Sequence, residues 1–147
     1  MLSVALPLAA LDLFVKATKR TPPWAYHQRS LGWLLLSLCL LAGMGLLTRI
    51  PSRAVAPAAG ILAGGVIGNT LSAASNGMEV PNPLIVDSDR ALIAFNLADV
   101  WAVSGIFLLV LALGTWLIQN RHLFPPPGAV RSARTEAFRR RFAGRQR

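Results

Sequence analysis

Four long apolar runs constrain this chain more than any other feature of its sequence. They span residues 1–17, 30–47, 54–74 and 91–118, and the second run contains no charged residue. A helix needs about 20 apolar residues to cross a hydrocarbon core that is about 30 Å thick. The chain is 54% hydrophobic and only 14% charged, which is too apolar for an ordinary water-soluble domain. We therefore predict an all-α membrane protein with four transmembrane helices.

The basic residues indicate how these helices are oriented. Lysine and arginine are enriched in the cytoplasmic loops of membrane proteins. If both termini are cytoplasmic, ten of the fifteen basic residues lie inside, including the eight beyond position 120. We therefore expect residues 1–120 to form the transmembrane domain and residues 121–147 a basic cytoplasmic tail. The tail contains the proline triplet 125–127 and is expected to meet anionic lipid headgroups rather than nucleic acid.

Metal and redox chemistry find little support in the sequence. The chain has one cysteine, Cys39, so it cannot form an internal disulfide. Its two histidines, His27 and His122, stand far apart and do not have the spacing of metal ligands. We therefore expect no metal and no cofactor.

A few polar residues lie within or at the ends of the apolar runs. An ionisable group at membrane depth costs about 2.5–3.5 kcal/mol on insertion scales, so each is a candidate for function. With both termini inside, these polar residues fall near the outer surface. They are Asp12, Lys16, Asn69, Asn96 and Asp99. We expect Asn69, Asn96 and Asp99 to line one cavity between the third and fourth helices. Asp12 and Lys16 are four positions apart, so they also fit a locally paired helix end at the membrane interface.

The third apolar run carries glycines at four-residue spacing. Gly60, Gly64 and Gly68 lie on one face of the expected helix. Such a strip has no side chains and lets a neighbouring helix approach closely. We interpret it as a packing surface and not as a phosphate-binding loop, because no strand precedes it.

Two short motifs resemble signal peptidase II, the bacterial lipoprotein signal peptidase. The first is the sequence GGVIGN at 64–69, and the second is FNLAD at 95–99. The resemblance implies a four-helix bundle in the bacterial cytoplasmic membrane, with Asp99 as one of two catalytic aspartates. It also implies that Asn69 and Asn96 help to bind substrate. Asp12 and Lys16 match the Asp and Lys that the family carries near the end of its first helix, and the resemblance assigns them to substrate binding as well.

The second catalytic aspartate of that family has no counterpart here. Its position falls at Pro81, in the sequence VPNP at 80–83. An aspartyl mechanism needs one carboxylate as base and a second, protonated, as acid, so one carboxylate cannot fill both roles. The family's Asp-Arg after its Gly-Asn is Ser72-Ala73 here, and its Asn-x-Gly-Ala-Ala-Phe element is absent from residues 27–32.

Three functions remain open on these grounds. The first is an impaired relative of signal peptidase II that binds a lipoprotein or another membrane partner in the former substrate groove. The second is an active aspartic peptidase that processes prolipoproteins, with Glu79, Asp87 or Asp89 replacing the missing acid, since all three lie in the same external segment. The third is a small assembly subunit of a membrane complex that packs through its glycine strip.

Overall fold

The computed structural model describes residues 1–89 and 91–124. Residues 1–113 form one compact unit, and Gly114 begins a second. The predicted basic tail lies outside the described residues from position 125 onward. Within the described ranges there are four α-helices, as predicted: α1 (Leu2–Thr18), α2 (Leu31–Leu47), α3 (Val55–Ser75) and α4 (Leu97–Gln119).

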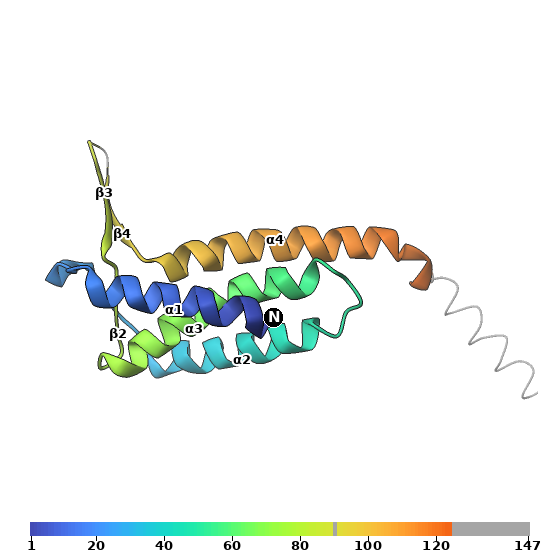
Figure 1. Cartoon of the computed structure of the whole chain (residues 1–147), viewed down its shortest axis with the longest axis horizontal. Helices are drawn as coiled ribbons and strands as arrows, with labels where there is room; N and C mark the ends of the chain where they lie inside the picture. Colours follow the sequence, from blue (N-terminus) through green and yellow to red (C-terminus); the bar gives the residue numbers. More distant parts are fainter. Residues whose placement is uncertain (90, 125–147) are drawn as a thin grey trace, which may run out of the picture. The chain divides into compact units, whose positions relative to one another are not determined.

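Helix α3 lies at the centre of the first unit, with α1 and α2 beside it (Figure 1). The glycine strip faces α1: a Cβ atom on Gly60 would lie 2.8 Å from the carbonyl oxygen of Met1, and one on Gly64 would lie 2.9 Å from the Cβ of Leu8. The strip is therefore a packing surface, as the four-residue spacing indicates. Small residues at the contact allow the two backbones to approach closely.

Helix α4 packs against α3 through further glycines. A Cβ on Gly65 would collide with backbone atoms of Ala98 and Ala102, and one on Gly105 would collide with the backbone of Leu62. Around these contacts lies an apolar core contributed by all four helices. Its buried members are Ala5, Met44, Val55, Ala58, Ala59, Leu62, Ala63, Leu109 and Ala112.

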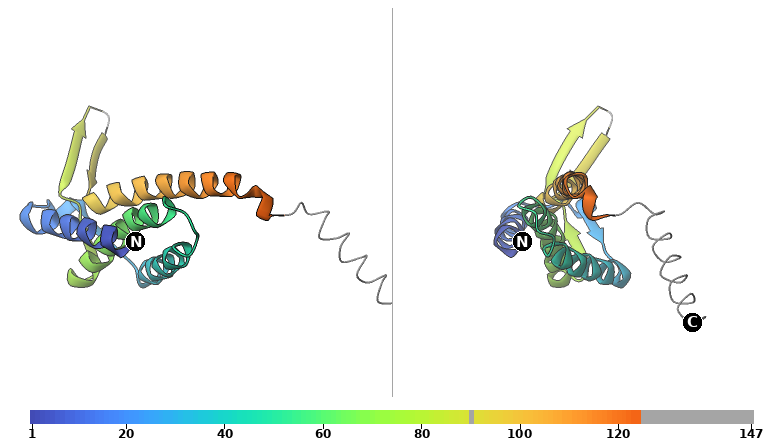
Figure 2. Two further views of the ribbon diagram at one scale, coloured as in Figure 1. Left: turned by 45° about the vertical axis from the view of Figure 1, so that its right-hand side comes forward. Right: turned by 90° about the vertical axis from the view of Figure 1, so that its right-hand side faces the viewer.

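Four short strands lie at one end of the helices, and the predicted all-α fold did not include them. β1 (Tyr26–Gln28) pairs antiparallel with β2 (Glu79–Pro81), and β3 (Leu84–Ser88) pairs antiparallel with β4 (Ala91–Phe95). The first pair joins the segment after α1 to the segment after α3. The second pair is a hairpin that extends away from the helices (Figure 2).

The fourth helix begins later than the sequence pattern predicted. Residues 91–95 form strand β4, and the helix starts at Leu97 instead of at position 91. A short apolar run fits a strand as well as a helix, and here no charged residue separates this run from the start of the helix that follows. The sequence nevertheless marks the start of α4, because Asn96 and Asp99 have the three-residue spacing of a helix capping box.

The turn after α3 positions β2. Gly77 has φ 61° and Met78 has φ 71°, and the Met78 N–H donates to the carbonyl of Ala73 at 2.8 Å. This return resembles the Schellman ending of a helix, which favours glycine in the left-handed region. The chain thereby reverses and enters β2 beside β1.

Candidate functional site

The first turn of α4 is held by a reciprocal pair of hydrogen bonds. The Asp99 N–H donates to Oδ1 of Asn96 at 3.0 Å, and the Asn96 N–H donates to Oδ2 of Asp99 at 3.1 Å. This is a capping box, which satisfies backbone donors that a helix start otherwise leaves unpaired. It also fixes the orientation of the Asp99 carboxylate at the end of the helix.

Asp12 provides a second cap from a different helix. Its Oδ1 accepts a hydrogen bond of 2.8 Å from the Ala98 N–H, and its Oδ2 lies 2.7 Å from Nζ of Lys16. The Asp12 side chain is fully buried and packs against Gly68. A buried carboxylate is tolerated there because it has a cationic partner and lies at the positive end of the α4 dipole. The pairing of Asp12 with Lys16 that the sequence suggested is therefore present, and it also joins α1 to α4.

Asn69 connects this ion pair to Asp99. Nζ of Lys16 donates to Oδ1 of Asn69 at 2.8 Å, and Nδ2 of Asn69 donates to Oδ1 of Asp99 at 3.0 Å. Three helices thus contribute to one polar chain at a single depth. Asp12, Lys16, Asn69, Asn96 and Asp99 are brought together, as expected from their common depth in the proposed topology.

The polar chain continues through two residues that sequence reasoning missed. Nδ2 of Asn96 donates to Oδ1 of Asn82 at 2.5 Å, and Nδ2 of Asn82 lies 2.8 Å from Nδ1 of His27. Asn82 is buried, and its N–H donates to the carbonyl of Ala25. In the sequence His27 is an isolated histidine, since the β1–β2 pairing that brings it to Asn82 joins residues more than 50 positions apart. The asparagine between two prolines is the one local signal that could have pointed to this position.

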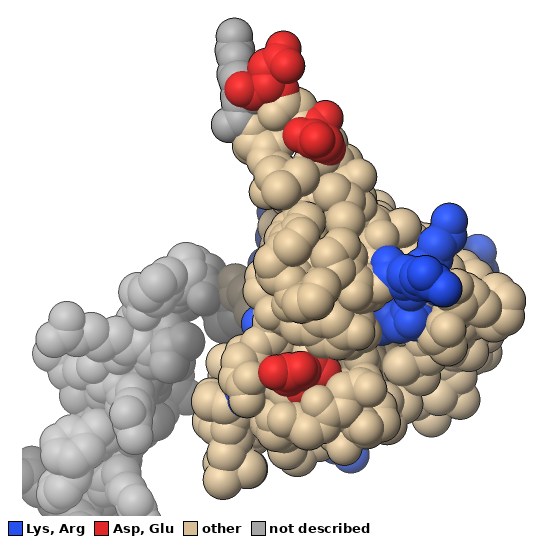
Figure 3. Space-filling view, turned by 90° about the vertical axis from the view of Figure 1, so that its left-hand side faces the viewer, with Lys and Arg blue, Asp and Glu red and all other residues tan. Residues whose placement is uncertain are grey.

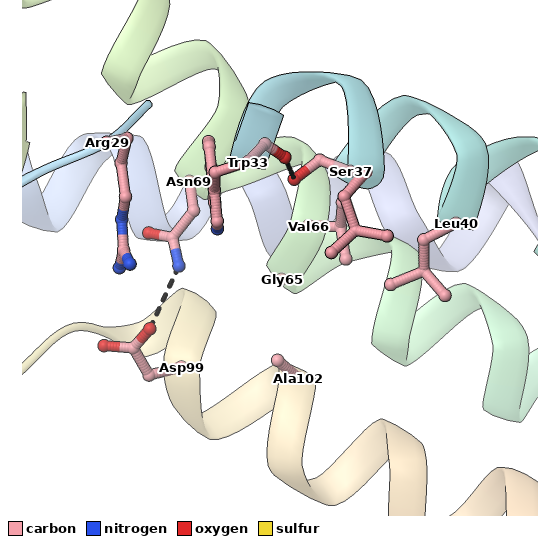
Figure 4. Close-up of a pocket in the computed structure, with 10 residues that line it drawn as sticks. Arg29, Trp33, Ser37, Leu40, Gly65, Val66, Asn69, Asp99 and Ala102 are labelled. Carbon is pink, nitrogen blue, oxygen red and sulfur yellow. Dashed lines mark hydrogen bonds between the residues drawn. The ribbon is translucent and has the colours of Figure 1, made fainter. Parts of the chain in front are cut away.

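A cavity of about 230 Å³ lies between α2, α3 and α4, next to the polar chain. Its apolar wall includes Trp33, Leu36, Leu40, Val66 and Ala102. Its polar side chains include those of Arg29, Asn69 and Asp99, and Figure 4 shows all three extending toward one region. The cavity expected between the third and fourth helices therefore also involves α2.

Asn96 does not line this cavity, although the sequence predicted that it would. It is fully buried, since its side chain is engaged in the capping box and in the bond to Asn82. It therefore orients Asp99 through the capping box and does not present a group to the cavity.

Arg29 enters the cavity from the connection between β1 and α2. Its guanidinium carbon lies 5.0 Å from the ring centre of Trp33, which is a cation–π contact. Its backbone N–H donates to the carbonyl of Met78 at 2.7 Å, so the backbone is tied to the turn after α3. Among the described residues its side chain forms no ion pair, and its Nε is buried without a hydrogen-bond partner.

Neither Pro81 nor the other acidic residues considered from the sequence line the cavity. Pro81 is buried in β2 opposite Tyr26, and Glu79 is half-buried in the same strand opposite Gln28. Asp87 and Asp89 are exposed near the free end of the hairpin, where Figure 3 shows acidic side chains. At about 3.3 Å per residue, Asp87 is roughly 10 Å along the hairpin from Phe95.

The arrangement suits binding better than acid–base catalysis. In the described part of the chain, Asp99 is the one carboxylate that lines the cavity. Each of its oxygens already accepts a hydrogen bond, from Asn69 and from the Asn96 backbone. A cavity with one carboxylate, one guanidinium and an apolar wall can orient a polar headgroup next to an apolar chain.

Comparison with known proteins supports a membrane fold. No family model and no curated protein matches the sequence. The structure is similar to a solved structure described as a bacterial membrane enzyme, with a TM-score of 0.58 and 17% sequence identity. The match covers 77% of this chain and 86% of that protein. Two described helices, α3 and α4, are long and apolar enough to cross a membrane, and α2 is a shorter apolar helix of 17 residues. The chain therefore has a fold similar to that of a bacterial membrane enzyme.

Proposed function

We propose that this chain is a divergent, catalytically impaired relative of signal peptidase II that binds a lipoprotein or another membrane partner in the cavity beside Asp99. One observation carries the proposal: the polar residues around Asp99 are connected by hydrogen bonds, while the resemblance assigns Pro81 to the position of the family's second aspartate. The motifs at 64–69 and 95–99 and the fold of a membrane enzyme support it. A scaffold that retains one carboxylate favours binding over peptide hydrolysis.

Complementation of a strain that lacks signal peptidase II tests the loss of activity. The wild-type chain is expected to leave prolipoprotein unprocessed, because one carboxylate cannot act as base and acid together. Glu79→Gln and Asp99→Asn test the competing mechanism, in which Glu79 and Asp99 form the catalytic pair. Processing by the wild type that is lost in both variants would overturn the proposal and establish a relocated pair of acids.

Binding needs its own measurement. Purified full-length protein is titrated with a fluorescent peptide that carries a diacylglyceryl cysteine, and the fluorescence anisotropy is recorded. We expect saturable binding that weakens when Leu40→Trp fills the cavity, whereas Leu46→Trp, on the exposed surface of α2, has no effect. Equal binding by both variants would contradict a role for the cavity.

Glu79 is the strongest basis for the alternative, an active aspartic peptidase. Glu79 and Pro81 are two residues apart in β2, so they lie on the same face of the strand. A glutamate has a longer side chain than an aspartate and can reach further along that face. Asp87 and Asp89 stay candidates for the same role, although the hairpin holds them away from α4.

A structural subunit of a membrane complex is a further alternative, although the glycine strip cannot be its contact surface, because the strip is buried within the chain itself. Val86 and Ile93 are opposite one another on one face of the hairpin and are 50% and 55% exposed. Exposed apolar side chains outside a membrane span favour a protein partner. Co-purification with a defined partner at fixed stoichiometry would support this function over the first.

Each of these proposals places the two termini in the cytoplasm of a bacterial cell. This topology rests on the distribution of lysine and arginine. Reporter fusions after residue 80 and after residue 125 are expected to report opposite sides, with the second in the cytoplasm. A cytoplasmic signal after residue 80 would contradict the topology and move the cavity to the inner face.

A further inference from the structure

The cavity is lined by two opposite charges that form no direct ion pair in the described part of the chain. They belong to Arg29 and Asp99. In Figure 4 the side chains of Arg29 and Asn69 lie next to one another, and Asn69 donates a hydrogen bond to Asp99. A guanidinium and a carboxylate held apart in one cavity are complementary to a ligand that is itself zwitterionic.

The geometry of Arg29 indicates which charge it binds. Its Nε is buried and lacks a partner, while Trp33 covers one face of the guanidinium. The terminal N–H groups of Arg29 are neither buried nor hydrogen-bonded within the described residues, so a ligand that accepts from them gains from both charge and hydrogen bonding. The planar guanidinium presents its N–H groups as a fork that matches a phosphate.

Asp99 has capacity left for a cation. Its two oxygens accept one hydrogen bond each within the protein, and a carboxylate has about four acceptor sites. A primary ammonium can donate to the remaining sites, whereas a quaternary ammonium has no N–H to donate. The carboxylate therefore distinguishes between these two headgroups.

The size of the cavity limits the rest of the ligand. At about 230 Å³ it is smaller than the roughly 300–1,000 Å³ of pockets that enclose drug-sized ligands. It can hold a headgroup and must leave acyl chains outside. Leu36 and Leu40 line the cavity and are 68% and 44% exposed, so they provide an apolar path toward the bilayer.

We propose that this cavity binds a phospholipid whose headgroup joins a phosphate to a primary ammonium, with the phosphate on Arg29 and the ammonium on Asp99. The lipid site goes beyond the proposed function and does not depend on it. The same cavity can hold a membrane lipid whether or not a lipoprotein displaces it.

Native mass spectrometry of the purified full-length protein tests the site. Phosphatidylethanolamine, phosphatidylcholine and phosphatidylglycerol with identical acyl chains are titrated in turn. We expect the wild type to prefer phosphatidylethanolamine, because among the three lipids only its headgroup can accept hydrogen bonds from Arg29 and also donate them to Asp99 from an ammonium. Equal binding of all three lipids would overturn the proposal, and this result needs no variant that must fold.

Two variants separate the charges. Arg29→Gln is expected to weaken binding of phosphatidylethanolamine and phosphatidylglycerol alike by about tenfold, because both lose the charged hydrogen bond to phosphate. Asp99→Asn should abolish the preference for phosphatidylethanolamine and leave phosphatidylglycerol bound as before. Arg49→Gln, which removes an exposed arginine outside the cavity, is the matched control and should bind like the wild type.

Two additional measurements separate a lipid site from a site for soluble phosphoethanolamine and from the lipopeptide site. Soluble phosphoethanolamine should compete weakly, and competition as strong as that of the lipid would overturn a lipid site. A wild-type protein that binds the three lipids equally but still binds the lipopeptide would overturn this inference and leave the proposed function in place. Unchanged lipid preference in both charge variants would equally contradict it.

Discussion

Helices α3 and α4 have similar lengths and opposite surroundings. α3 has 21 residues and α4 has 23, and both are apolar enough to cross a membrane. In the most hydrophobic 18-residue stretch of each helix, 61% of the residues of α3 are buried within the protein, compared with 11% of those of α4. α3 is rich in glycine and alanine, whereas α4 presents large exposed side chains such as Val103 and Phe107.

The difference shows where the fold depends on particular residues. A helix that other helices surround needs small side chains at each contact, so its sequence is constrained by backbone approach. A helix that faces lipid needs only apolar side chains, and many of them serve equally well. Substitutions on α3, and at the points where α4 meets α1 and α3, should therefore cost far more than substitutions on the open face of α4.

Asp12→Ala should have the largest effect, because it breaks the connection between α1 and α4. The change leaves Lys16 buried without its partner and removes the cap on Ala98. Breaking a buried ion pair costs about 3–5 kcal/mol of unfolding free energy. Unfolding by SDS titration, followed by circular dichroism, measures it, with exposed Asp87→Ala as the control. Equal stability of the two variants would show that the buried pair contributes little.

Gly65→Ala and Gly105→Ala should come next, since each places a methyl group against the backbone of the facing helix. Overpacking of this kind costs about 1–3 kcal/mol. The matched control is Gly43→Ala in α2, where nothing lies within 4 Å of the added atom. That control should gain about 0.5–1 kcal/mol from the better helix propensity. If all three variants respond alike, the contact between α3 and α4 is not as close as described.

Asn96→Ala should have a smaller effect, confined to the start of α4. It removes a helix cap, which costs about 0.5–2 kcal/mol, and leaves Asn82 without its donor. Asn96→Ser keeps a capping side chain and should recover part of the loss. Hydrogen exchange at Ala98 and Asp99 reports the fraying directly. Unchanged exchange in the alanine variant would argue against the capping box.

Val103→Ala should have the smallest effect and sharpens the contrast between the helices. The side chain is 70% exposed on α4, so its removal loses little packing. Surface changes of this kind stay within about 0.5 kcal/mol. The SDS titration used for Asp12→Ala applies here as well. A loss above about 1 kcal/mol, outside that range, would indicate that this face of α4 is covered by a partner.

Much of the helical architecture could be predicted from local patterns. Four apolar runs located four helices, and the ends of the first three agree with the structure to within one residue. The glycine spacing correctly identified a packing surface. The predicted start of α4 is too early, because the apolar strand β4 leads almost directly into the apolar helix and the spacing of Asn96 and Asp99 fits a shared helix face as well as a cap.

The residues of the candidate site also fall into two groups, those that local sequence patterns identify and those that they do not. Asp12, Lys16, Asn69 and Asp99 stand out because polar groups are rare in apolar runs, and a common depth predicts that they meet. Asn82, His27 and Arg29 lie in loops and short strands, where polar residues are ordinary and carry no such signal. Their roles follow from the β1–β2 pairing, which brings together segments that are far apart in the chain.

What this sequence determined by itself is its membrane character, its helices and the polar residues that those helices must bury. Each of these follows from hydrophobicity and spacing within about 20 residues of chain. The tertiary structure alone decided that α2 closes the cavity, that Arg29 lies on Trp33 within it, and that Asp12 caps a helix 86 residues away. The physical reason is that hydrogen bonds and close backbone contacts depend on positions in space, and distant segments carry no local record of where they will meet.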